Sequence, residues 1–362
     1  MATDYRNHIF KKFKEYIPGE QPESDDWIKL NTNENPFSPS PKVEQKLKEL
    51  AMCTEAFRKY PNAMGEPLRS ALALHYNVEP EQVVVTNGSD EALALLCRII
   101  LDAGDRVATP EFTYSLYDTL VSAANGVLEY IPAKNGHMVD LEALAQTDAK
   151  MIFFPNPNAP TGEFTSVEKL ERAIENSKAL WVIDEAYNDF VEQSPDGHKN
   201  SFIHKLSKYD NCVVTRTFSK SHALAALRTG YLLSANPYIM SGIRAGKDSY
   251  NEDFVALEIG MVALSDETWL HKTTKAVISE RKKMQASLEN LGFTVLPSQA
   301  NFVLAEAPKK TTAVNLLEAL KQEKILVRHF ANSKLDNMLR ISIGSTDENS
   351  VLIETLKKIL RK

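Results

Sequence analysis

The sequence predicts an α/β protein in which a large domain, built on a mostly parallel sheet, is followed by a smaller α+β domain. Three observations predict this architecture. Short β-branched or apolar runs alternate with helical patterns up to about residue 265, as βα units require. The run Leu180–Ile183 is apolar throughout, as expected for a strand of a parallel sheet covered on both faces. A chain of 362 residues is also too long for one small core.

The expected elements divide the chain into three parts. Residues 1–44 form an N-terminal arm with proline turns and one short helix, residues 45–265 the large domain, and residues 266–362 the small domain. In the large domain we expect strands at 83–86, 106–110, 126–131, 151–154, 180–183 and 212–216. In the small domain we expect strands at 293–296, 301–304, 325–328 and 339–343, and helices near 311–322 and 348–361.

One helical pattern is long enough to join the two domains. It runs from residue 264 to residue 291 and carries a cluster of charges at 280–283. Such a cluster is typical of a solvated helix face. We therefore expect these four side chains to lie in water.

Composition excludes several classes of function. A net charge of −6 argues against a nucleic-acid partner, because binding a phosphate backbone needs a positive face. The mostly apolar run Ala92–Leu101 is far shorter than the roughly 20 residues that a membrane helix needs. Cys53, Cys97 and Cys212 are widely spaced and odd in number, so we expect packing residues in a reducing cytoplasm and no metal site.

Lys220 stands at the end of an expected strand. The run 213–228 begins as a β-branched strand and is expected to end as an alanine-rich helix, with Lys220 at the junction. A lysine walled by apolar residues near Arg228 would lose solvation and feel a second cation, and both effects favour a nucleophilic amine that can hold an aldehyde as a Schiff base. The hydroxyls of Thr217 and Ser219 and the guanidinium of Arg228 suit a phosphate. Pyridoxal 5'-phosphate (PLP) fits these groups, although a solvated surface lysine is the plain alternative.

Two further strand ends carry polar residues. Ser89 and Asp90 follow a strand and a glycine turn at the start of a helix, where unpaired N–H groups and the helix dipole make an anion site. Asp90 is equally well explained as an N-cap or first-turn acid. Asp184 ends a buried strand, where a carboxylate is costly unless it is paired, and a protonated pyridine nitrogen would supply the partner. The alternative for Asp184 is a cap of the next helix.

Arg340 lies in the middle of an apolar strand. Arginine is rarely buried without a planar anion to pair with, and Arg328 is placed similarly on another strand. A structural salt bridge remains open for Arg328. No G-x-G-x-x-G or G-x-x-x-x-G-K-[ST] motif occurs, so nicotinamide-binding and P-loop readings lose their main support.

Taken together, these motifs resemble those of fold-type I PLP-dependent aminotransferases of class II, in the form shown by histidinol-phosphate aminotransferases. The matching segments are S-K-x-x-x-L-A-x-L-R at 219–228, D-E-A-Y at 184–187, N-E-N-P at 33–36 and Y-P at 60–61. The segment 155–162 resembles the family's N-P-N-N-P-T-G, but Ala159 stands where the family has the asparagine that contacts the cofactor's ring hydroxyl. Asn158 is the nearby candidate to replace it.

The resemblance implies a seven-stranded large-domain sheet and a role for each matched residue. Lys220, Asp184 and Tyr187 would be catalytic, with Asp184 on the ring nitrogen and Tyr187 on the ring hydroxyl. The residues implied to bind the cofactor are Ser89, Asp90, Tyr114, Asn158, Asp184, Tyr187, Thr217, Ser219, Lys220 and Arg228, together with Tyr60 from the neighbouring subunit of a homodimer. The residues implied to bind substrate are Tyr16, Asn33, Arg328 for a phosphate and Arg340 for a carboxylate.

The implied activity is a cytoplasmic, ping-pong transamination between L-histidinol phosphate and 2-oxoglutarate in histidine biosynthesis. Two arginines suit two anions, which favours this substrate pair. Three alternatives stay open: an aromatic amino acid aminotransferase, a lyase similar to threonine-phosphate decarboxylase, and a non-catalytic PLP-binding regulator. A lyase would release carbon dioxide without needing an oxo acid.

Overall fold

The computed structural model describes residues 3–5, 10, 19–22, 24, 26–192, 200–331 and 334–361, and its centre is a seven-stranded sheet. The strand order is β2-β8-β7-β6-β5-β3-β4. Neighbouring strands from β7 to β4 run parallel, whereas β8 is antiparallel to both of its neighbours. The strands are β2 Val83–Thr86, β3 Arg106–Pro110, β4 Val127–Ile131, β5 Met151–Pro155, β6 Leu180–Asp184, β7 Cys212–Thr217 and β8 Gly230–Leu233. The predicted mostly parallel sheet is confirmed.

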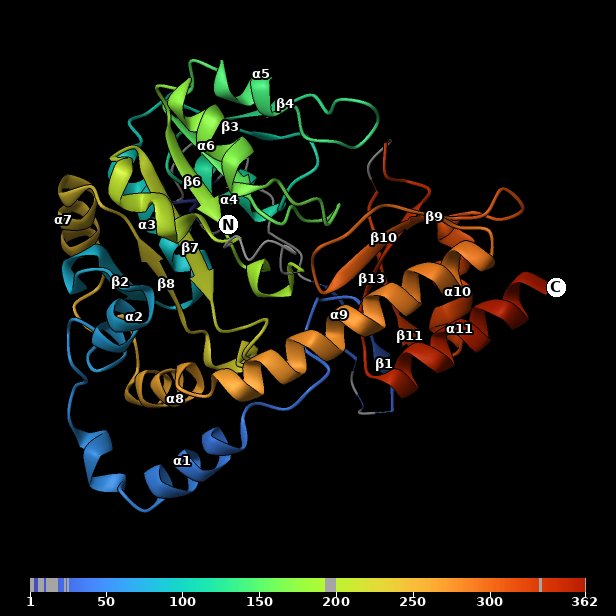
Figure 1. Cartoon of the computed structure of the whole chain (residues 1–362), viewed down its shortest axis with the longest axis horizontal. Helices are drawn as coiled ribbons and strands as arrows, with labels where there is room; N and C mark the ends of the chain where they lie inside the picture. Colours follow the sequence, from blue (N-terminus) through green and yellow to red (C-terminus); the bar gives the residue numbers. More distant parts are fainter. Residues whose placement is uncertain are drawn as a thin grey trace.

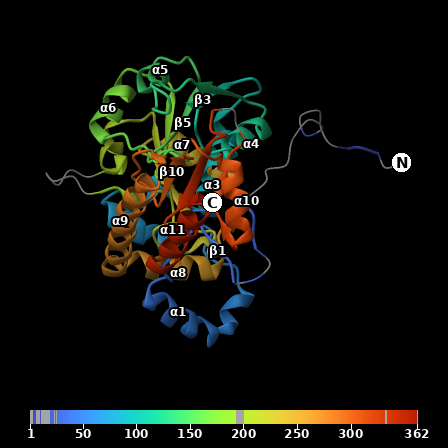
Figure 2. The ribbon, with the colours of Figure 1, turned by 90° about the vertical axis from the view of Figure 1, so that its right-hand side faces the viewer.

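Helices cover both faces of this sheet, because side chains on each buried strand alternate between two cores. Val83 and Val85 belong to one core and Val84 to the other. Helices α3, α4 and α7 pack on the Val84 side, and α2, α5, α6 and α8 on the opposite side, with α1 against α8 (Figures 1 and 2). Their bounds are α1 Pro41–Ala51, α2 Leu68–Tyr76, α3 Gly88–Ile100, α4 Leu116–Ala123, α5 Leu141–Ala145, α6 Val167–Glu175, α7 Pro237–Gly246 and α8 Phe254–Leu264.

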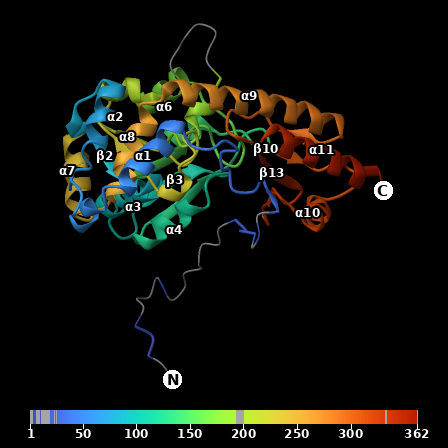
Figure 3. The same cartoon turned by 90° about the horizontal axis from the view of Figure 1, so that it is seen from below.

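The C-terminal part forms a second unit with its own core. Its four-stranded antiparallel sheet has the order β12-β13-β10-β9, and a separate parallel pair joins β1 to β11. The long helix α9 runs from α8 to this unit (Figures 1 and 3). The elements are β1 Ile28–Lys29, α9 Glu267–Asn290, β9 Thr294–Val295, β10 Phe302–Glu306, α10 Ala313–Gln322, β11 Ile325–Leu326, β12 Arg328–His329, β13 Met338–Ser342 and α11 Thr346–Arg361. The predicted strand at 325–328 is therefore divided between two sheets.

The expected alanine-rich helix before Arg228 is wrong. The only helical turn there is η5, a 3-10 turn at Ala225–Leu227. Ala223 and Arg228 have φ values of 58° and 55°, in the left-handed region that a right-handed helix cannot include. The other 3-10 helices are η1 Thr54–Arg58, η2 Pro80–Gln82, η3 Asn188–Phe190 and η4 Phe202–Lys208.

Two further expectations about exposure are wrong. Arg281, predicted on a solvated helix face, has 0% of its surface exposed. Its Nη1 donates to the backbone oxygens of Phe190 and Ala300, both at 2.9 Å, so this arginine connects α9 to η3 and to the segment before β10. Cys53 was expected to pack inside but is exposed, whereas Cys97 and Cys212 are buried as free thiols. In the part of the chain that the structure covers, no helix combines the length and apolarity needed to cross a membrane.

Candidate active site

A cavity of about 340 Å³ lies where β5, β6 and β7 end and the four-stranded sheet begins. The last residues of these three strands, Pro155, Asp184 and Thr217, form part of its lining. The cavity also brings together these predicted site residues: Asn33, Ser89, Asp90, Tyr114, Asp184, Tyr187, Thr217, Ser219, Lys220, Arg228, Arg328 and Arg340. Ligands in α/β proteins bind at this carboxyl edge of the sheet.

Lys220 lies three residues beyond the end of β7, and its amine projects into the cavity. Its Nζ donates to the backbone oxygen of Thr32 at 3.4 Å and lies 5.7 Å from the ring centre of Tyr187. The backbone oxygen of Lys220 accepts a hydrogen bond from Asn35 Nδ2 at 2.9 Å. The Lys220 amine thus lies beside an aromatic ring, and the hydrogen bond from Asn35 holds the backbone of Lys220 in place.

Asp184 is the buried acid of the site. Its Oδ2 accepts from the hydroxyl of Tyr117 at 2.9 Å, and its Oδ1 accepts from Ala186 N–H at 3.2 Å and Thr215 Oγ1 at 3.4 Å. Burial raises the pKa of Asp184 to about 6, although these hydrogen bonds act in the opposite direction. A cation bound in the cavity beside this carboxylate would relieve the cost of burying its charge.

The start of α3 and the residues after β7 form a polar cradle at one end of the cavity. Ser219 N–H donates to Thr217 Oγ1 at 3.1 Å, and this hydroxyl donates to Ser219 Oγ at 2.9 Å. A Cβ on Gly230 would lie 2.6 Å from the backbone nitrogen of Ser89, so only glycine lets β8 come so close to the helix start. Hydroxyls, helix N–H groups and the guanidinium of Arg228 then meet at one place, which suits a phosphate.

Asp90 is a first-turn acid of α3, as one of the two sequence interpretations held. The N-cap residue is Asn87. Asp90 Oδ2 accepts from Arg228 Nη2 at 3.0 Å, and Oδ1 accepts from the hydroxyl of Tyr114 at 3.4 Å. This ion pair holds Arg228 at the mouth of the cradle.

Two arginines of the four-stranded sheet also line the cavity. Arg328 and Arg340 are direct partners in the antiparallel pairing of β12 with β13. Arg340 donates from Nη2 to Asn31 O at 3.0 Å, and its guanidinium lies 5.3 Å from the ring centre of Phe302 and 5.6 Å from that of Phe330. Like charges placed opposite each other destabilise a sheet, and an anion bound between them offsets the repulsion.

Three consecutive residues of the N-terminal segment contact different parts of the site. Asn31 and Thr32 accept from Arg340 and Lys220 through their backbone oxygens, as described above. Asn33 donates from Nδ2 to the hydroxyl of Tyr187 at 3.0 Å. Because Asn33 supplies a donor, the proton of the Tyr187 hydroxyl is directed to another acceptor.

Three predicted residues are not part of this cavity lining. Asn158 is buried and donates from Nδ2 to the backbone oxygen of Phe112 at 2.8 Å and to Thr161 Oγ1 at 3.1 Å, while Ala159 lines the cavity. Tyr60 is 80% exposed and stacks on another aromatic ring at the surface. Tyr16 lies outside the described residues.

Sequence reasoning missed several residues of the site. Tyr117 and Thr215, which bond to Asp184, looked like ordinary core residues of a helix and a strand. Phe330, which lies against both arginines, follows a two-residue strand with no signature of its own. The roles of Asn31 and Thr32 come from backbone oxygens, which leave no trace in residue type.

Known proteins match the chain over nearly its whole length. The family model "Aminotransferase class I and II" matches residues 25–356. Histidinol-phosphate aminotransferase 1 of Burkholderia pseudomallei is 36% identical over 361 residues, covering 98% of this chain and 99% of that protein. Histidinol-phosphate aminotransferase 1 of Oceanobacillus iheyensis is 36% identical over 363 residues, covering 99% of each chain.

The fold is also that of a solved structure. Histidinol-phosphate aminotransferase from Sinorhizobium meliloti, solved in complex with PLP, superposes with a TM-score of 0.88 at 24% identity, covering 99% of this chain and 98% of that one. The fold predicted from the sequence is confirmed, and so is the predicted family: the chain belongs to the aminotransferase class I and II family.

Proposed function

We propose that the chain is a PLP-dependent aminotransferase that moves an amino group from L-histidinol phosphate to 2-oxoglutarate, giving imidazole acetol phosphate and L-glutamate. The observation that carries this proposal is the arrangement of one cavity. The Lys220 amine, the buried carboxylate of Asp184, the polar cradle and two paired arginines all line it. The names of the curated relatives support the substrate pair.

The residues of the cavity fit PLP. The polar cradle, lined by Ser89, Thr217, Ser219 and Arg228, suits the phosphate, and Tyr114 at the wall suits stacking on a flat ring. Asp184, whose burial favours a cationic neighbour, suits a protonated ring nitrogen. The hydroxyl of Tyr187, which accepts from Asn33, has its own proton available for an oxygen on the ring.

When bound, PLP supplies an aldehyde and a ring that withdraws electrons from the reacting carbon. The Lys220 amine would hold that aldehyde at rest and, once displaced by the amino substrate, would take the proton from the substrate's α-carbon. Asp184 would keep a proton on the ring nitrogen, and the hydrogen bond from Tyr117 would orient the carboxylate for this task. Arg228 would neutralise the phosphate, sharing its charge with Asp90.

The two arginines support the choice of anionic substrates. In this proposal Arg340 binds the carboxylate of glutamate and Arg328 the phosphate of L-histidinol phosphate. Each guanidinium can bind such an anion in a bidentate manner, and desolvation in the cavity strengthens the contact.

A homodimer is part of the proposal, with Tyr60 of each chain reaching the phosphate in the neighbouring site. Tyr60 and Tyr250 stack at 4.5 Å with an interplanar angle of 12°, and both rings are exposed. Met52 and Phe57, close to Tyr60 in the sequence, are exposed as well. This apolar surface supports cover by a second copy.

Mixing two variants that are impaired in different residues tests the shared site. Tyr60→Phe would lose one hydrogen bond to the phosphate and weaken PLP binding about tenfold, as the loss of about 1.5 kcal/mol implies. Mixed with Lys220→Ala subunits at limiting PLP, it should form dimers with one intact site and recover activity. Tyr238→Phe, an exposed tyrosine on α7, is the control. Activity no higher than the average of the two parents would contradict the shared site.

We also propose the division into large and small domains at 265/266, in the turn between α8 and α9. The proposed arm boundary at residue 44 falls inside α1, which begins at Pro41, so residue 40 is the better limit. Location in the cytoplasm stays a prediction.

An absorption experiment tests the function. L-histidinol phosphate added alone to PLP-loaded protein should remove the band of the bound cofactor, and 2-oxoglutarate should restore it. A band that responds only to aromatic amino acids would remove the phosphate role from Arg328. Release of carbon dioxide without an oxo acid would indicate a lyase, and a protein that takes up no PLP would overturn the proposal.

A further inference from the structure

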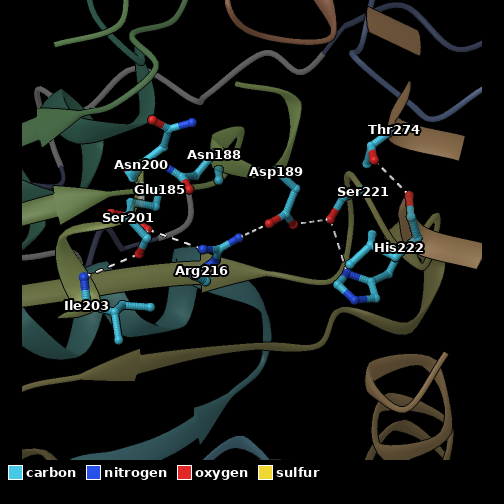
Figure 4. Close-up of polar contacts among 12 residues, drawn as sticks. Glu185, Asn188, Asp189, Asn200, Ser201, Ile203, Arg216, Ser221, His222 and Thr274 are labelled. Carbon is cyan, nitrogen blue, oxygen red and sulfur yellow. Dashed lines mark hydrogen bonds and ion pairs between the residues drawn. The ribbon is translucent and has the colours of Figure 1, made fainter. Parts of the chain in front are cut away.

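A largely buried polar network begins at the residue that follows Lys220 in the chain. It joins Glu185, Asp189 and Arg216 to Ser221 and His222, which follow the lysine in the chain (Figure 4). The network is set apart from the cavity lining, and none of the roles proposed above uses it.

Arg216 is the centre of this network. Its Nη1 donates to Glu185 Oε2 at 3.3 Å, and its Nη2 donates to Asp189 Oδ1. Burial raises the pKa of Asp189, but the guanidinium, His222 and the hydroxyl of Ser221 outweigh it and hold the pKa at about 2. Asp189 is therefore a charged carboxylate at neutral pH and can only accept hydrogen bonds.

This charge fixes the direction of the hydrogen bonds. Asp189 Oδ2 contacts Ser221 Oγ, so the single proton of that hydroxyl points to the carboxylate. His222 Nδ1, 3.1 Å from the same hydroxyl oxygen, must then be the donor. Burial lowers the pKa of His222 to about 4, so the ring is neutral at neutral pH and has one proton. That proton is on Nδ1, and Nε2, which meets no hydrogen-bond partner among the described residues, is a bare acceptor.

The backbone on both sides of this contact is held by Asn35. Its Nδ2 donates to the backbone oxygen of Lys220 at 2.9 Å and to that of Ser221 at 3.0 Å. Ala223, two residues further, takes a left-handed φ of 58°, so the lysine lies in a turn without a helix to support it. Hydrogen bonds from Asn35 to the backbone and from Ser221 to Asp189 therefore hold this turn in place of the backbone hydrogen bonds of a helix.

We propose that Asp189, anchored by Arg216, is a positioning residue that sets the reach of the Lys220 amine through its hydrogen bond to Ser221. The inference rests on the proposed function, since the lysine must act on a bound cofactor. A base displaced by a fraction of an ångström loses rate without losing substrate affinity.

Two serines of the same network allow a matched test. Ser221→Ala removes the bond to Asp189, and Ser201→Ala removes the 2.6 Å bond from Ser201 Oγ to Glu185 Oε2 at the other end of Arg216. Both serines are buried, so both variants should lower the melting temperature to a similar degree. Only Ser221→Ala should lower kcat, about tenfold or more with KM unchanged, and Ser221→Thr should restore most of it.

Nitrogen-15 NMR of the cofactor-free protein supplies a readout that does not depend on activity. The His222 ring should show the Nδ1–H tautomer in the wild type and in Ser201→Ala, and a changed Nδ1 shift in Ser221→Ala. An Nε2–H tautomer in the wild type would overturn the assigned direction of the bonds. If Ser221→Ala does not fold, Ser221→Cys keeps the size and weakens the donor.

The outcomes separate this inference from the proposed function. Equal kcat values for Ser221→Ala and Ser201→Ala, in protein whose wild type transaminates normally, would overturn the positioning role alone. A wild type that takes up no PLP would overturn the proposed function and the catalytic part of this inference, while the NMR result would still decide the hydrogen-bond direction.

Discussion

The wall built by the seven-stranded sheet places its acids in hydrogen bonds with its own residues, whereas the wall built by the four-stranded sheet sets two arginines opposite each other. Asp184 and Asp90 each accept hydrogen bonds from neighbouring side chains. Arg328 and Arg340 meet across a strand pair beside aromatic rings. Under the proposed function, the residues of the first wall carry out the reaction and the arginines of the second wall bind the anionic group of the substrate.

Lys220→Ala should have the largest effect, because it removes the amine from the first wall. A group that transfers a proton in the transition state contributes about 10²- to 10⁴-fold, so we expect a loss of at least about 10²-fold in kcat. Steady-state assays with L-histidinol phosphate would measure this. Lys208→Ala, an exposed lysine of η4, should match the wild type. Activity retained within tenfold in Lys220→Ala would move the base elsewhere.

Asp184→Asn should change how the stability of the cofactor-free protein depends on pH. The pKa of Asp184 is raised in the fold from its ordinary value of 3.8 to about 6, so the folded state holds a proton more firmly than the unfolded state. The stabilisation that Asp184 gives to the folded state is fully present below about pH 4 and is lost as the pH rises through about 6. When the pH falls from 7 to 4, the free energy of unfolding of the wild type should therefore rise by up to about 3 kcal/mol relative to that of Asp184→Asn.

Denaturant unfolding of both proteins at several pH values would measure this difference. Other buried acids, such as Glu185, titrate in both proteins and cancel in the comparison. A pH-independent difference between the two proteins would show that Asp184 is not protonated in this range. Bound PLP should abolish the gain at low pH, because the cation of its ring favours the charged carboxylate.

Replacing Arg328 and Arg340 one at a time should show which arginine binds the phosphate and which binds the carboxylate. We expect these effects to be smaller than those of the changes at Lys220 and Asp184. Arg328→Gln should raise KM for L-histidinol phosphate about tenfold, the loss of about 1.5 kcal/mol expected for one charge-assisted contact, and should leave KM for glutamate nearly unchanged. Arg340→Gln should show the larger change with glutamate. Equal effects of both variants on both substrates would mean that the arginines act as one anion site.

The sequence was most informative about the first wall. Strand ends mark its polar residues: Asp184 closes an apolar run, and Ser89 follows a glycine turn at a helix start. Lys220 was recognised as a site residue, but the backbone conformation of the residues that follow it was not predicted. Alanine-rich sequence predicts a helix from local preference, and contacts such as Leu224 N–H to Phe218 O select a left-handed turn instead.

The second wall and the polar network around Arg216 were harder to predict. Arg340 was recognisable as a charge within an apolar strand, but its pairing with Arg328 depends on register, which two-residue strands do not reveal. The contacts of Asp189 and Arg281 depend on which loops meet after folding. Residue type shows that such groups need partners and does not show where the partners are.

The pairing of β1 with β11 has a consequence for the order of folding. Ile28 pairs with Ile325, about 300 residues later, and the same N-terminal segment supplies the backbone oxygens that contact Arg340 and Lys220. The last strand of the seven-stranded sheet, β8, ends at Leu233, so about 90 residues remain before Ile325, and at about 5–20 residues per second the ribosome needs roughly 5–18 s to make them. The seven-stranded sheet can assemble during that time, so Lys220 should be in place and open to solvent well before its site is closed. Cofactor capture on the ribosome would then precede completion of the substrate pocket.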